Sequence, residues 1–101
     1  MTTRIHLTLL MVLGLAGRAV AAEQLDFATV DRLSYRYFME KQWDSVIHIG
    51  TRALHQDIDY YFLRIRLGIA YYEKKNYFRS VTHLERAKRF NSADTLATEY
   101  L

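Results

Sequence analysis

The sequence predicts an all-α fold made of helical hairpins, and three observations support this prediction. Apolar residues recur at helical spacing through four consecutive segments. A single offset of 34 residues aligns the second pair of segments with the first. The 101-residue chain has no proline, four glycines and 50% hydrophobic residues, a composition that suits closely packed helices joined by short turns. We expect helices over about 25–39, 43–54, 60–73 and 77–90, followed by a fifth that begins at 95.

The 34-residue offset defines an internal repeat. It relates four pairs of residues of similar type: Leu33 and Leu67, Tyr37 and Tyr71, Trp43 and Tyr77, and Ala53 and Ala87. A fixed period of this length is typical of stacked helix–turn–helix units, in which each unit buries its apolar face against the next.

The second copy of the repeat resembles the tetratricopeptide repeat family, whose pattern is W-x2-L-G-x2-Y, then A-x3-F, then P. Leu67, Gly68 and Tyr71 match that pattern in register. Four positions depart from it: Arg64, Ser80, Leu84 and Ser92. The first copy matches at its leucine, tyrosine, tryptophan and alanine, and has Ser34 in place of the family's glycine.

This resemblance implies a right-handed solenoid of about two repeats, at 27–60 and 61–94, with a partial third repeat at 95–101. Since Leu101 falls at the repeat position of Leu33 and Leu67, we expect the chain to be the N-terminal part of a longer protein. The residues expected to pack the repeats are Leu33, Tyr37, Trp43, Ala53, Leu67, Gly68, Tyr71, Tyr77, Leu84 and Ala87.

Several local features follow from the same helical assignment. Asp57 or Asp59 is expected to cap the third helix by accepting hydrogen bonds from its free backbone N–H groups. Gly50 lies in mid-helix, where glycine is less favourable than alanine by about 1 kcal/mol. A neighbouring helix is therefore expected to approach Gly50 closely. In the fourth helix we expect Val81 to pack inward and His83 to face solvent.

The first 22 residues predict an export signal. A weakly basic start precedes the apolar run Leu7–Leu15, and Ala19–Ala22 offers an A-x-A cleavage site. The run is shorter than the roughly 20 apolar residues that a membrane-spanning helix needs, although an uncleaved N-terminal anchor is the alternative. We expect cleavage after Ala21 or Ala22, a domain over 23–101, and a location in the periplasm or cell envelope.

Charge and composition argue against several classes of function. Removal of residues 1–22 lowers the formal charge from +3 to about +1, so we expect no nucleic-acid partner. The segment Arg79–Arg89 is basic and could contact nucleic-acid phosphates or anionic lipid, but a solvated helix face near its C-terminus is the preferred interpretation. The absence of cysteine excludes disulfides and thiol chemistry.

No constellation of catalytic residues is evident in the sequence. Asp44, His48 and His55 share one helical face, as imidazole and carboxylate ligands of zinc can. A fourth ligand is lacking and His55 lies at the helix end, so a solvated polar face is preferred. We expect no enzyme activity, no metal and no cofactor.

The resemblance implies an interaction module that binds a partner protein or peptide through a concave face formed by the first helix of each repeat. The residues implied for that face are Asp31, Tyr35, Phe38, Phe62, Ile65, Ile69, Tyr72 and Glu73. The alternative function is a periplasmic N-terminal segment of a larger outer-membrane assembly or barrel protein. Self-association through the C-terminal end, near Leu96, Tyr100 and Leu101, is also expected.

Overall fold

Every regular element of the part of the chain that the structure describes is a helix, which confirms the predicted all-α class. The computed structural model describes residues 23–91 and 95–101. Its helices are α2 (Phe27–Met39), α3 (Trp43–His55), α4 (Tyr61–Glu73), α5 (Tyr77–Phe90) and α6 (Thr95–Tyr100). The predicted export signal at 1–22, the turn at 92–94 and the side chain of Leu96 lie outside the described residues.

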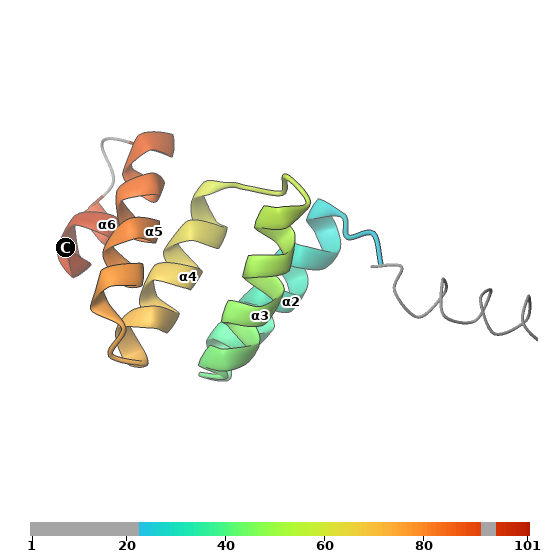
Figure 1. Ribbon diagram of the computed structural model, residues 1–101, viewed down its shortest axis with the longest axis horizontal. Coiled ribbons are helices and arrows are strands. Elements are labelled where there is room, and N and C mark those ends of the chain that lie inside the picture. The colour runs from blue at the N-terminus through green and yellow to red at the C-terminus, as the bar shows by residue number, and fades with distance from the viewer. Residues whose placement is uncertain (1–22, 92–94) are drawn as a thin grey trace, which may run out of the picture.

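Helix α4 is the central element of the structure. Each helix packs against the one that follows it, and α4 also contacts α2 and α6. In Figure 1, α4 lies between the α2–α3 pair and the α5–α6 pair. The contacts of α2 with α4 and of α4 with α6 place these three helices in one row.

Side-chain caps fix the start of two of the helices. Asp26 Oδ1 accepts a hydrogen bond from the backbone N–H of Thr29 at 2.7 Å, at the start of α2. Asn76 Oδ1 accepts from the N–H of Arg79 at 3.3 Å, at the start of α5. Both contacts satisfy one of the N–H groups that a helix leaves unpaired at its first turn.

The predicted cap of the third helix is wrong. Helix α4 begins after Tyr60, whose backbone is extended and whose side chain makes no capping bond. Asp57 instead forms the turn, with a φ of 62° in the left-handed region that aspartate tolerates. The carboxylate of Asp59 instead points to Arg64, from which each of its oxygens accepts a hydrogen bond at 2.7 Å.

Two apolar clusters lie on opposite sides of α4, so the helix is buried on both sides. The first joins α2, α3 and α4 around Leu63 and Leu67, and the second joins α4, α5 and α6 around Ile65 and Leu84. The sequence of this segment has two apolar stripes, one of Leu67, Gly68 and Tyr71 and one of Phe62, Ile65, Ile69 and Tyr72, whereas a helix packed on one side shows a single stripe. Leu67 and Tyr71 lie in the first cluster, and Ile65 and Ile69 lie in the second.

Both glycines in the described helices lie where two helices approach closely. A Cβ atom on Gly50 would lie 2.6 Å from Cδ2 of Leu67, and one on Gly68 would lie 2.5 Å from Cδ2 of Leu84. Ser80 Oγ donates a 2.7 Å hydrogen bond to the carbonyl of Gly68 at the second contact. The close approach expected at Gly50 is therefore present, and α4 makes one such contact with α3 and one with α5.

The predicted packing residues differ in how deeply they are buried. The ones inside the helix layers are Ala53, Leu67, Gly68, Tyr71, Leu84 and Ala87, and the half-buried ones are Leu33, Tyr37 and Trp43. Tyr77 is exposed, because at the first position of α5 its ring contacts Tyr72 and not either cluster.

The predicted buried face of α5 is correct at Leu84 and Ala87 but wrong at Val81 and His83. Helix α5 buries Ser80, Leu84 and Ala87, which recur at the spacing of one helix face. Val81 is one residue past Ser80, about 100° around the helix, and is exposed. His83 lies beside the buried face and is half-buried, with its ring stacked on Tyr71 at 5.4 Å.

Candidate functional site

A largely apolar hollow of about 390 Å³ lies between helices α2, α4 and α6. We call it the α2–α4–α6 groove. It is lined by Tyr35, Phe38, Phe62, Ile65, Arg66, Ile69, Glu99 and Tyr100. Its volume falls within the range of sites that hold small ligands or single anchoring side chains.

Five of the eight residues predicted for the concave face line this groove. Tyr35 and Phe38 come from α2, and Phe62, Ile65 and Ile69 come from α4. They meet because α2 and α4 are in contact, and because residues three or four apart share a helix face.

The other three predicted residues lie elsewhere. Asp31 does not line the groove and pairs with Arg66. Tyr72 is exposed, and its ring lies 5.4 Å from the rings of both Tyr77 and Tyr100. Glu73 is exposed at the last position of α4.

Sequence reasoning missed three lining residues, and the repeat contained a signal for two of them. Glu99 and Tyr100 lie 34 residues after Ile65 and Arg66, so the offset could have placed them beside the same surface. Arg66 is four residues after Phe62 and shares its helix face, but a charged side chain in a helix is usually assigned to solvent.

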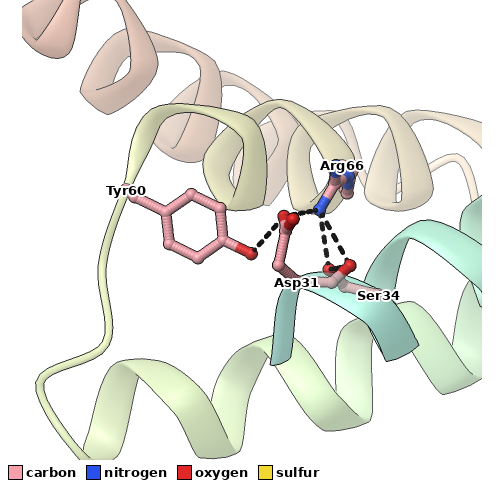
Figure 2. Close-up of polar contacts among 4 residues, drawn as sticks. All are labelled: Asp31, Ser34, Tyr60 and Arg66. Atoms are coloured by element: carbon pink, nitrogen blue, oxygen red, sulfur yellow. Dashed lines mark hydrogen bonds and ion pairs between the residues drawn. The ribbon is translucent and has the colours of Figure 1, made fainter. Parts of the chain in front are cut away.

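Polar contacts join Arg66 of α4 to α2. Arg66 Nη1 donates to Oδ1 of Asp31 at 2.7 Å, to Oγ of Ser34 at 3.0 Å and to the carbonyl of Asp31 at 3.3 Å. Figure 2 shows the hydroxyl of Tyr60 reaching the same carboxylate, to which it donates at 2.9 Å. These contacts hold the first helix against the third on one side of the α2–α4–α6 groove.

The charges of this network are well defined at neutral pH. The hydrogen bond from Arg66 holds the pKa of Asp31 below its usual value, so the carboxylate is ionised. Burial, and the hydrogen bond to Asp31, raise the pKa of Tyr60 to about 12, so the phenol keeps its proton and donates it. Because Asp31 is ionised and accepts while the phenol of Tyr60 keeps its proton and donates, the network is suited to positioning α2 against α4.

Arg66 has donors that make no hydrogen bond to the described residues. Its guanidinium carbon lies 5.4 Å from the ring centre of Tyr35 and 5.8 Å from that of Phe62, in cation–π geometry. All of its hydrogen bonds to the described residues come from Nη1. Its Nε and Nη2 atoms make no hydrogen bond to the described residues. Among those residues, no side-chain nitrogen or oxygen is both buried and without a hydrogen-bond partner, so these two atoms are not fully buried.

A second polar network lies outside the groove, between α4 and α5. Arg64 binds both carboxylate oxygens of Asp59, and its Nη1 donates to Nδ1 of His83 at 3.0 Å. Burial, together with the positive charges of Arg64 and Arg79, lowers the pKa of His83 to about 4, against the opposing effect of Asp59. His83 is therefore neutral, and its Nδ1 accepts.

This network predicts a loss of stability in mild acid. His83 binds a proton in the unfolded chain at its ordinary pKa of 6.5 but in the folded chain only near 4. The unfolded state thus holds more protons between these values, and stability falls as pH drops through that window. The pKa of Asp59 is lowered, so the stabilisation from this carboxylate persists until the pH falls below 3.8. Allowing for partial solvent access, we expect a loss of about 1–2 kcal/mol between pH 7 and pH 4.

Urea unfolding at pH 7 and pH 4 measures this loss of stability. A variant of His83 tests whether this histidine causes it. His83→Gln keeps an acceptor for Arg64 but does not titrate, so its stability should change less across the window. His48→Gln, at an exposed position of α3, should behave as the wild type does. An equal pH response of wild type and His83→Gln would contradict the assignment.

The two alternative sites that the sequence raised look different in the structure. Asp44 forms an exposed ion pair with Lys74 at 3.1 Å, and within residues 23–91 and 95–101 no three metal-ligating side chains gather. In the basic segment, Arg86 and Arg89 line a hollow of about 300 Å³ together with Arg64, but Glu85 is also in its wall.

Comparison with known proteins leaves the candidate site to be interpreted from its own geometry. No family model, no curated protein and no solved structure matches this chain. None of the helices in the described part of the chain has both the length and the apolar character needed to cross a membrane.

Proposed function

We propose that this protein is an interaction module that binds a segment of a partner protein in the α2–α4–α6 groove. The observation that supports the proposal is an apolar hollow with aromatic side chains left in solvent at its wall. Tyr35 is 53% exposed and Phe62 is 55% exposed. Large aromatic side chains of this kind supply much of the binding energy in protein interfaces, because they bury a large area at a small loss of conformational entropy.

The proposed architecture is a right-handed solenoid of the tetratricopeptide type. Three features support it: the contacts of α2 with α4 and of α4 with α6, the 34-residue offset, and the equivalent turns at Lys41 and Lys75. Both lysines lie in the left-handed region, with φ values of 56° and 63°. In such a stack the groove lies on the face formed by the first helix of each repeat, and further repeats would extend it.

Binding in a groove of this size is expected to depend on one or two apolar anchors. Phe38, Ile65 and Ile69 would contact the anchor deep in the groove, while Tyr35 and Phe62 close over it. Since the hollow is short, affinity for an isolated peptide is expected to be about micromolar.

Removal of the two exposed aromatic side chains tests the proposal. Peptides selected from a random 12-residue display library on the wild-type chain should bind Tyr35→Ala/Phe62→Ala at least about tenfold more weakly by calorimetry, because the anchor then loses most of its contacts. The matched control is Phe78→Ala/Phe90→Ala. Its rings are 84% and 49% exposed on α5, outside the groove, and its affinity should equal that of the wild type.

Circular dichroism must show that both double variants keep their helices. Equal loss of affinity in the two variants would contradict binding in the α2–α4–α6 groove. Failure to select any peptide on the wild-type chain would contradict the proposed function itself.

We further propose that the protein works after export to the cell envelope, with residues 1–22 acting as a cleaved signal. The apolar run and the alanine-rich end of this segment support the proposal. N-terminal sequencing of the protein recovered from the periplasm should begin at Ala22 or Glu23. Recovery with Met1 intact would contradict cleavage and favour an N-terminal anchor.

A further inference from the structure

The two charged residues that line the α2–α4–α6 groove differ in how their charges are compensated. Arg66 is 11% exposed and its charge is compensated by Asp31 at 2.7 Å. Glu99 is an exposed carboxylate in the wall of the same groove, and within the described residues it forms no ion pair. Asp31 lies outside the lining, but because it neutralises Arg66, Glu99 is the one uncompensated charge among the described lining residues.

Aromatic rings next to Glu99 favour a positive ligand group. Tyr100 follows Glu99 and also lines the groove, and the ring of Tyr72 lies 5.4 Å from that of Tyr100. Ring faces attract ammonium and guanidinium groups, and the long stems of lysine and arginine pack on apolar surface while the charged head stays in water. A lysine or arginine head could therefore reach the Glu99 carboxylate while its stem covers a tyrosine.

The free donors of Arg66 suit a neutral acceptor. Its Nε and Nη2 atoms make no hydrogen bond to the described residues and are not fully buried, while Nη1 already donates to Asp31 and Ser34. A carboxylate bound there would share a guanidinium whose charge Asp31 already compensates, in a groove that also contains Glu99. A main-chain carbonyl accepts the same hydrogen bonds without that repulsion.

We propose, on the basis of the proposed function, that the bound segment is a positively charged stretch of polypeptide with an aromatic or branched apolar anchor. The anchor occupies the hollow, a lysine or arginine beside it pairs with Glu99, and a main-chain carbonyl accepts from Arg66. Charge then determines which apolar segments bind, since the hollow alone would accept any of them.

Three synthetic peptides that differ only in charge test this proposal. They share the core Phe-Leu-Gly-Phe and carry two flanking residues that are Lys in the first peptide, Gln in the second and Glu in the third. Fluorescence anisotropy with the full chain at low salt should rank their affinities in the order Lys, Gln, Glu. The Lys peptide should bind about three- to tenfold more tightly than the Glu peptide, and 0.5 M NaCl should reduce this ratio.

Variants at Glu99 assign the preference to one carboxylate. Glu99→Gln should reduce the ratio of the two affinities, and Glu99→Lys should reverse the order. Glu85→Lys makes the same change of charge on α5, outside the groove, and should leave the order unchanged. Because Glu99 is exposed, these variants are expected to fold.

The outcomes separate this inference from the function on which it rests. If the three peptides bind equally, or the Glu peptide binds most tightly, the charge preference is refuted while the groove still binds apolar segments. An order that survives in Glu99→Lys also refutes the inference. If all three peptides bind wild type no better than Tyr35→Ala/Phe62→Ala, the proposed function fails as well.

Discussion

Replacement of Leu67 by alanine should lower the free energy of unfolding by about 2–5 kcal/mol. Leu67 is fully buried in the first apolar cluster, and its side chain packs against the backbone of α3 at Gly50. Because Gly50 has no side chain that could move into the space, the lost methyl groups would leave a cavity between α3 and α4. That loss is a large share of the 5–15 kcal/mol typical of whole domains.

Two further leucine variants make the test specific. Leu67→Met keeps the volume nearly constant and should lower stability by less than about 1.5 kcal/mol. Leu101→Ala makes the same truncation at an exposed position and should be nearly neutral. Urea unfolding monitored by circular dichroism measures all three. A Leu67→Ala protein as stable as Leu101→Ala would show that the contact of α3 with α4 is not formed as described.

Replacement of Arg66 by methionine should lower stability by about 1–3 kcal/mol. Methionine keeps much of the apolar stem but removes the hydrogen bonds that Arg66 donates to Asp31 and Ser34, and Ser34 is fully buried. Removal of one partner from a buried pair is strongly destabilising because it leaves polar groups unpaired. Asp31 is 41% exposed, so water can replace part of the hydrogen bonding that its carboxylate loses. This replacement sets the lower end of the expected loss of stability.

The same variant should change the titration of Asp31. Since the hydrogen bond from Arg66 is the main cause of its lowered pKa, the pKa of Asp31 should rise toward 3.8 in Arg66→Met. NMR titration of the side-chain carboxyl carbon measures this directly. Arg32→Met, at an exposed position of α2, is the control and should change neither stability nor the Asp31 titration appreciably. Wild-type values of both quantities in Arg66→Met would contradict the network.

Features set by local spacing were predictable from the sequence. The four long helices and the two apolar stripes of α4 follow from apolar residues three or four apart on one helix. The close contact at Gly50 follows from the presence of a glycine in mid-helix. Five lining residues of the groove were predicted from the resemblance to tetratricopeptide repeats, which implies that the first helices of successive units lie beside one another. For these residues, the orientation that the helical spacing of apolar side chains predicts is the same as the one that packing between helices requires.

Features set by tertiary partners were not predictable in the same way. Asp59 was expected to cap α4 but binds Arg64, and His83 was expected in solvent but stacks on Tyr71. In both cases a polar side chain has a partner on another element that no local pattern reveals. Arg66 was missed for the same reason: only the contact with Asp31 of α2 explains a charged residue within an apolar face.

Because α4 is the central helix, we expect local unfolding to begin at α6 and not at α4. Since α4 contacts each of the other described helices, we expect the hydrogen-bonded amides in its middle to exchange only when most of those contacts are lost. Amide hydrogen exchange in α4 is therefore expected to require global unfolding, whereas α6, with six residues and contacts to α4 and α5, can detach alone. Detachment of α6 would remove Glu99 and Tyr100 from the groove while the aromatic wall on α2 and α4 stays in place. Local opening at one end of the chain would then change the selectivity of the groove without unfolding it.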